Sequence, residues 1–158
     1  ACFRGWAVMK GYYDDPERTA EVIDQEGWFR TGDLAVIDQD GYVHLVGRIK
    51  DMIRVGGENV SVADVEGFLL QHGKVKQAAV VGAPEARLGE VCVAFIQLKT
   101  DVEATEAEFI SYCKAGLASF KVPRKVIFVD TWPMSGTGKI QKFVLQQSVG
   151  EIALSKGK

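Results

Sequence analysis

Residues 47–60, which read GRIKDMIRVGGENV, mark the place where the pattern of the chain changes. Two short arms, 52–55 and 58–61, flank a pair of glycines, which predicts a tight hairpin. Strand-like segments precede this stretch, and helical spacing begins directly after it. We therefore expect two structural units that meet at residues 50–51. The expected bounds are 1–49 for the first unit, 52–148 for the second and 149–158 for a tail.

The first unit is expected to be rich in strands. Residues 3–13 alternate around bulky side chains and predict a strand, and a proline-led acidic segment at 16–23 predicts a short helix. Further strands are expected at 28–31, 34–37 and 42–46, the last two joined by the turn DQDG at 38–41.

The second unit mixes helices and strands. Helical spacing predicts helices from Val62 to about Gly73, from Thr105, where a capping box begins, and from Ile140 to Val149. Strands are expected at 78–82, 91–98 and 126–129. The predicted fold class is α+β: a small mixed α/β domain, made of a short hairpin and a three-stranded sheet flanked by helices, which follows a β-rich segment.

Composition excludes several classes of protein. The 158 residues carry a formal charge of −2, which argues against non-specific nucleic-acid binding. Cys2, Cys92 and Cys113 have no disulfide-framework or zinc-ligand spacing, so no metal site is expected, and a reducing cytoplasm is the expected location. No apolar run is long enough to span a bilayer. The start at Ala1, without an initiator methionine, suggests a segment of a longer protein.

Two polar positions in the first unit can carry chemistry. Asp33 follows a glycine at a strand edge, where its carboxylate can accept two hydrogen bonds from a ribose diol or simply close an Asx-turn. Arg48 can pair with Asp33 or reach ribose or phosphate as a forked donor. Lys50 lies with Asp51 where the two units meet, and this pair is either a point of backbone rotation or part of an ordinary solvated turn between the units.

The second unit offers three further candidates. Gly56 and Gly57 allow a ligand to approach the backbone, although a hairpin turn explains them equally well. Residues 133–140, PMSGTGKI, predict a flexible loop that presents Lys139 to developing negative charge; they do not fit the phosphate-loop pattern. Basic residues concentrate at 119–142 and include Lys121 and Arg124, which serve either solubility or binding of a phosphorylated ligand.

Taken together and in order, these segments resemble the adenylate-forming superfamily of acyl-CoA synthetases, peptide-synthetase adenylation domains and beetle luciferases. The segments are GWFRTGDL at 27–34, DGY at 40–42, GRIKDMI at 47–53, GGENV at 56–60 and GTGKI at 136–140. The resemblance covers nearly the whole chain. It implies that residues 1–49 are the tail of a large ATP-binding domain and that the rest is the mobile C-terminal domain.

The resemblance also implies an activity and residue roles. A carboxylate reacts with ATP to form an acyl-adenylate, and the thiol of CoA then displaces AMP. It assigns ribose binding to Asp33 and Arg48, the hinge to Lys50 and the adenylation lysine to Lys139. It places the path of CoA at Gly56 and Gly57, and the basic patch with Lys121 and Arg124 would suit the phosphates of CoA.

The resemblance also implies what is missing. The loop that holds the ATP phosphates and the residues that hold magnesium belong to the large domain, which is the expected partner, so the segment alone is expected to be inactive. Residues 120–123, FKVP, resemble the stand-alone fatty-acyl and aryl CoA ligases, which points to fatty-acid metabolism.

Two alternatives remain open at this point. One is the adenylation domain of a peptide synthetase, which would use a carrier protein instead of CoA. The other is a non-catalytic interaction module that self-associates through exposed residues such as Trp6 and Trp28. A nucleic-acid role is the least favoured because the basic patch is small.

Overall fold

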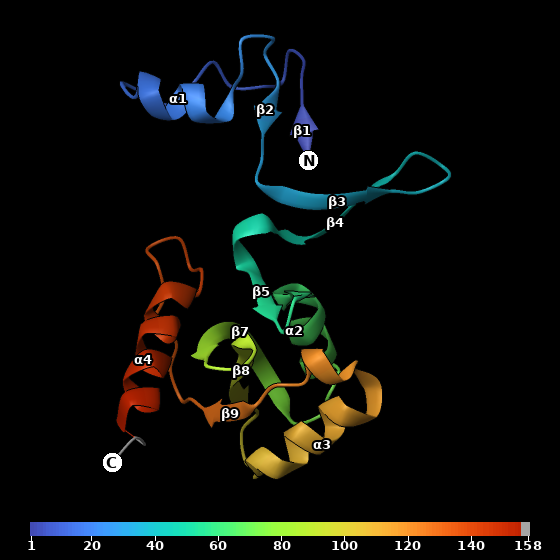
Figure 1. Cartoon of the computed structure of the whole chain (residues 1–158), viewed down its shortest axis with the longest axis vertical. Helices are drawn as coiled ribbons and strands as arrows, with labels where there is room; N and C mark the ends of the chain where they lie inside the picture. The colour runs from blue at the N-terminus through green and yellow to red at the C-terminus, as the bar shows by residue number, and fades with distance from the viewer. Residues whose placement is uncertain (156–158) are drawn as a thin grey trace. The chain divides into compact units, whose positions relative to one another are not determined.

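The chain divides into two compact units, one of residues Ala1–Lys50 and one that begins at Asp51 (Figure 1). The computed structural model describes the backbone of residues 1–155 and the side chains of residues 1–149. No helix in this described part is long and apolar enough to span a membrane.

The first unit consists of two small antiparallel ribbons and one helix. β1 pairs with β2, and β3 pairs with β4 through the turn at 38–41, as predicted. Asp15 caps α1 by accepting a hydrogen bond from the backbone N–H of Arg18 at 3.0 Å. The bounds are β1 Cys2–Phe3, α1 Pro16–Val22, β2 Phe29–Arg30, β3 Asp33–Ile37 and β4 Val43–Arg48.

The strand predicted at 3–13 is wrong. Only Cys2–Phe3 is a strand, and Tyr12 makes just an isolated bridge to Asp15. The backbone turns back on itself after Phe3, because the N–H of Val8 donates to the carbonyl of Gly5 at 3.1 Å. The bulky side chains alternate in sequence, but no neighbouring strand pairs with them there.

A five-stranded sheet organises the second unit, in the order β6-β5-β8-β7, with β9 parallel to β8. The β5–β6 hairpin joins the larger strands through one register pair, Val55 with Gly89. The predicted α+β class is therefore confirmed, with the hairpin forming part of the sheet. The strands are β5 Met52–Val55, β6 Glu58–Ser61, β7 Val75–Glu85, β8 Gly89–Leu98 and β9 Lys125–Phe128.

Helices cover both faces of this sheet (Figure 1). α2 (Val62–Leu70) and α3 (Glu106–Gly116) contribute to one core, in which Phe109 is fully buried. α4 (Lys142–Ser155) contributes Leu145 and Val149 to a second core on the other face. Because β7 and β8 are covered on both faces, their middle residues are buried regardless of the direction in which each side chain points.

Some element bounds differ from those predicted. α2 ends at Leu70, before Gly73, and the central strands are longer than their apolar runs. The last helix begins at Lys142 rather than Ile140, because Ile140 forms a β-bridge with Met134. It continues to Ser155, so the part of the predicted tail from 149 to 155 is helical, and 156–158 lie outside the described residues. Short 3-10 turns, Ile49–Asp51 and Ser119–Lys121, complete the chain.

Candidate ligand pockets and the exposed lysine turn

Three predicted residues of the first unit share one cavity. Asp33, Arg48 and Lys50 line a pocket of about 730 Å³. The backbone closes it, because the N–H of Ile49 donates to the carbonyl of Gly32 at 2.9 Å and so ties the end of β4 to the start of β3. The remaining lining residues are Tyr12, Arg18, Phe29, Thr31, Gly32 and Ile49.

Asp33 and Arg48 form an ion pair at this pocket. Arg48 Nε donates to Asp33 Oδ1 at 3.0 Å, so of the alternatives considered the direct pairing is present. The hydroxyl of Thr31 accepts from the backbone N–H of Asp33 at 3.0 Å. The side chain of Asp33 is 22% exposed and that of Arg48 is 55% exposed, so both can still reach a ligand in the cavity. A carboxylate beside a forked donor suits a diol or a phosphate ester.

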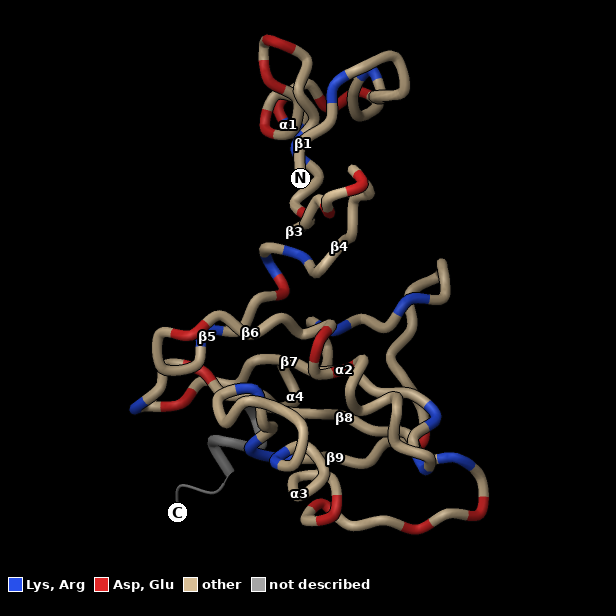
Figure 2. The backbone as a smooth tube through the Cα atoms, turned by 90° about the vertical axis from the view of Figure 1, so that its right-hand side faces the viewer, with Lys and Arg blue, Asp and Glu red and all other residues tan. Residues whose placement is uncertain are grey.

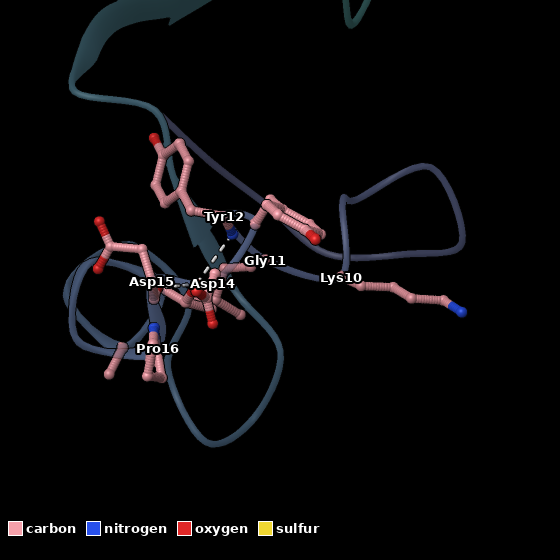
Figure 3. A pocket seen from close by; sticks show the side chains of 10 residues that line it. Lys10, Gly11, Tyr12, Asp14, Asp15 and Pro16 are labelled. Atoms are coloured by element: carbon pink, nitrogen blue, oxygen red, sulfur yellow. Dashed lines mark hydrogen bonds between the residues drawn. The ribbon is translucent and has the colours of Figure 1, made fainter.

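Tyr12 and Arg18 are pocket residues that the sequence did not single out. The guanidinium of Arg18 lies 4.3 Å from the centre of the Tyr12 ring, a cation–π contact on the pocket wall. A second, shallow cavity of about 710 Å³ adjoins Tyr12 (Figure 3). There the backbone N–H of Tyr12 donates to the hydroxyl of Thr19 at 2.9 Å. The Gly11-Tyr12 pair before a helix was a signal in the sequence, but nothing in the sequence indicated that Tyr12 would line the same pocket as Asp33.

The glycine turn of the second unit also lines a pocket, of about 290 Å³. Gly56 lies in this pocket together with Arg124, so the structure brings these two predicted residues together. Arg87 and Glu58 line it as well and were missed, since nothing in the sequence near Arg87 indicates a contact with the turn.

Gly57 and Lys121 are not among the lining residues of this pocket. Lys121 Nζ instead donates to Asp64 Oδ2 on α2 at 2.8 Å, so its charge is already paired. Its side chain remains 26% exposed. The basic patch is therefore divided between a pocket residue, Arg124, and an ion-paired lysine.

Lys139 lies in a tight, hydrogen-bonded turn rather than an open loop. Ser135 holds the lysine backbone from both sides: its N–H donates to the carbonyl of Lys139 at 2.8 Å, and its hydroxyl accepts from the N–H of Lys139 at 3.1 Å. Gly138 adopts a φ of +76°, which favours glycine. The side chain of Lys139 is exposed and forms no salt bridge with any side chain up to residue 149.

Charge is distributed without a single basic face. Residues 1–50 contain 6 basic and 9 acidic residues, and the rest of the chain contains 13 and 12. Lys and Arg positions of the second unit are interspersed with Asp and Glu (Figure 2). In the described part of the chain no group of three or more His, Cys, Asp or Glu residues could hold a metal ion.

The sequence matches the model of a known protein family. Residues 64–139 match the family described as "AMP-binding enzyme C-terminal domain". The putative acyl-CoA synthetase YngI of Bacillus subtilis is 47% identical over 151 residues, which is 96% of this chain and 28% of that protein. The mitochondrial medium-chain acyl-CoA ligase ACSF2 of Rattus norvegicus is 44% identical over 94% of this chain and 24% of its own length.

Solved structures of similar enzymes also match this chain in fold and sequence. ATP-bound MatB from Rhodopseudomonas palustris matches 92% of this chain with a TM-score of 0.84 and 39% identity, over 29% of the MatB chain. Amide bond synthetase McbA from Marinactinospora thermotolerans matches 93% with a TM-score of 0.85 and 36% identity, over 30% of its chain. The chain thus spans only 24–30% of the length of each of these proteins.

Proposed function

This chain belongs to the AMP-binding enzymes, whose C-terminal domain it contains at residues 64–139, and we propose that it is the C-terminal part of an ATP-dependent acyl-CoA synthetase. The observation that carries the proposal is the 44–47% identity to acyl-CoA synthetases along more than nine tenths of the chain. In the proposed reaction a carboxylate oxygen attacks the α-phosphate of ATP and releases pyrophosphate. The thiolate of CoA then attacks the acyl carbon and releases AMP.

We propose that Asp33 and Arg48 hold the ribose of ATP. Their shared pocket and their mutual hydrogen bond support this role, because the pair fixes the carboxylate at the strand edge. One carboxylate oxygen accepts from Arg48, and the second is left to accept from a ribose hydroxyl.

We propose that Lys139 is the catalytic lysine of adenylation. Two anions, the carboxylate and the triphosphate, must approach each other in this step, so an ammonium placed between them lowers the repulsion. An exposed ammonium on a backbone fixed by Ser135 is suited to that task, since the turn orients the side chain without neutralising it.

We propose that CoA passes the glycine turn during thioester formation. Gly56 and Arg124 line one pocket, where a narrow pantetheine chain and a phosphate-binding guanidinium could act together. Gly57 completes the turn outside the pocket. Lys121 can contribute only if the phosphate competes with Asp64 for its ammonium.

We propose that Lys50 is the hinge between the two units. It lies in the 3-10 turn Ile49–Asp51, where the division between the units falls, and its side chain is exposed. A few residues at the end of an element can absorb the φ/ψ change of a domain rotation. Such a rotation would exchange the Lys139 turn for the glycine turn at the reaction centre.

The same proposal extends to the parts that this chain does not contain. We propose that a large N-terminal domain holds the ATP phosphates and magnesium and selects the acyl group, that the segment alone is inactive, and that the enzyme acts in fatty-acid metabolism in the cytoplasm. The matched segment is only 28% of one relative and 24% of the other, which supports the first point.

A second candidate differs in the acceptor. McbA, an amide bond synthetase, is 36% identical, so an amine in place of CoA is compatible with this C-terminal domain. A peptide-synthetase carrier or a self-associating module is also compatible, and the full exposure of Trp6 supports the latter.

The test uses the full-length protein that carries this chain. We expect carboxylate-dependent ATP–pyrophosphate exchange and, with CoA, a thioester. Lys139→Ala should strongly lower the rate of exchange, leaving a small residual rate that can still be measured, but leave thioester formation from preformed acyl-adenylate largely intact. An amide product with amines and none with CoA would favour the second candidate. Equal loss of both half-reactions in Lys139→Ala would contradict the two-step role.

A further inference from the structure

Glu66 joins three elements of the second unit at one carboxylate oxygen. Its Oε1 accepts from the backbone N–H of Val80 on β7 at 2.7 Å and lies 2.7 Å from Nζ of Lys142, the first residue of α4. The side chains of Glu66 and Lys142 are 17% and 33% exposed. The ion pair is therefore largely shielded from water, which makes it stronger than a pair on an open surface.

The location of this contact explains why it forms. β7 is the terminal strand of the sheet order, so its outward N–H and C=O groups need partners from outside the sheet. Glu66 supplies an acceptor to Val80, and Gln146 on α4 donates to the carbonyl of Gly82 at 3.4 Å. Lys142 and Gln146 are one helical turn apart, so α4 lies along the β7 edge with two polar contacts.

The ion pair also compensates an unfavourable charge. α4 has a lysine as its first residue and no acidic residue in its first turn, whereas the positive end of a helix dipole favours anions. The carboxylate of Glu66, brought from α2, provides that anion. Without it, Lys142 would favour fraying of the first turn of α4.

The first turn of α4 is directly connected to the lysine turn. Lys142 follows Lys139 by only three positions. The turn that carries Lys139 is closed by the Met134–Ile140 bridge and by the hydrogen bond from the N–H of Gln141 to the carbonyl of Pro133 at 2.8 Å. Any shift of Lys142 is therefore transmitted through a short, hydrogen-bonded segment to Lys139.

We infer that Glu66 and Lys142 are positioning residues that fix the Lys139 turn against the β7 edge for the adenylation step. The inference rests on the proposed function of Lys139. Glu66 would thus act on the adenylation step only through Lys142 and the Lys139 turn, without contacting a reacting group itself.

The first test measures order and needs no activity. Amide hydrogen exchange on the 158-residue chain should show faster exchange at residues 140–145 in Lys142→Met and in Glu66→Gln, which retains an acceptor for Val80. Lys74→Met is the matched control, because Lys74 and Glu108 form an ion pair of similar length, 2.8 Å, at α3. The control should leave residues 140–145 unchanged. Unchanged exchange in both test variants would overturn the inference.

The second test measures the two half-reactions in the full-length protein. Lys142→Met and Glu66→Gln should lower kcat of adenylation about ten-fold, in line with the loss expected from a displaced catalytic group, with little change in KM for ATP. Thioester formation from preformed acyl-adenylate should be unchanged. Lys142→Arg should restore adenylation, and Lys74→Met should affect neither step.

The double variant separates positioning from general destabilisation. If Lys142 acts through Lys139, Lys142→Met should cause no further loss of adenylation in a Lys139→Ala background. A further loss there, or an equal loss in both half-reactions, would overturn the inference. If Lys139→Ala itself leaves adenylation intact, the proposed function fails, and the exchange measurement still decides whether the ion pair orders the turn.

Discussion

Asp33 and Arg48 are cross-strand partners in the β3–β4 register, and their side chains are joined by a hydrogen bond of 3.0 Å. Residues directly opposite each other on an antiparallel pair are held at a fixed separation by the backbone. The carboxylate is therefore oriented before any ligand arrives, which reduces the entropy that binding would otherwise cost.

Asp33→Asn in the full-length protein should raise KM for ATP about 10- to 100-fold, because a hydrogen bond to a charged group contributes roughly 1.5–3 kcal/mol. Asp38→Asn is the control: Asp38 lies in the turn of the same hairpin, 2.7 Å from His44, and does not line the pocket. Steady-state kinetics at varied ATP concentration measures both. An equal rise in KM in the two variants would mean that the hairpin, not the carboxylate, matters.

The glycine turn should tolerate few side chains. Gly57 has a φ of +92° with open space around its Cα, so Gly57→Ala should cost about 1 kcal/mol from backbone strain alone. Gly57→Asn should cost less, because Asn adopts positive φ more readily. Gly73→Ala, also in open space but without a positive φ, should change stability by less than about 0.5 kcal/mol. Urea unfolding would measure all three, and equal losses would exclude strain at the turn as the cause.

The sequence predicted correctly those features that depend on a few neighbouring residues. The hairpin at 52–61 is correct because Gly56 and Gly57 supply both positive φ values themselves. The failure at 3–13 has the opposite cause: alternation there indicates a strand only if a partner strand exists. The contact between Glu66 and Lys142, and the presence of Arg87 beside Gly56, join residues far apart in sequence, so no spacing rule could predict them.

Low pH should remove the contribution of the Lys74–Glu108 ion pair to the stability of the fold. The hydrogen bond from Lys74 is the main cause that lowers the pKa of Glu108 from its usual 4.5, and a hydrogen bond from the backbone of Thr105 acts in the same direction. A lowered folded-state pKa stabilises the fold above the unfolded pKa, and this stabilisation is lost as pH falls through the folded value. Glu108→Gln should therefore lower the urea midpoint at pH 7, and the difference should shrink as the pH is lowered below 4.5. A difference that persists at the lower pH would assign the effect to packing.

The three cysteines should differ sharply in reactivity. Burial raises the pKa of Cys92 to about 11 and likewise that of Cys113, so hardly any thiolate exists at neutral pH, whereas Cys2 is exposed. Titration with a thiol reagent at pH 7.5 should show one fast thiol in the native chain and the other two only after unfolding. Cys2→Ser should remove the fast phase. A second fast thiol in that variant would show that one core opens readily.

Two helical glycines should respond to alanine in opposite directions. Gly67 in α2 has open space where a Cβ would lie, so Gly67→Ala should stabilise the fold by about 0.5–1 kcal/mol through helix propensity. At Gly116 in α3 an added Cβ would lie 2.3 Å from Cζ of Phe68, whose ring stacks on Tyr112 at 4.7 Å.

Gly116→Ala should therefore destabilise by about 1–3 kcal/mol, since the half-buried, stacked ring of Phe68 must move against the core on which it packs. Phe68→Ala costs stability by itself, but in that background Gly116→Ala should lose most of its effect, because the clash is gone. Chemical unfolding of the four variants and the parent gives the coupling energy. Additive losses from Gly116→Ala and Phe68→Ala would show that the ring is not the obstacle and that the end of α3 is strained for another reason.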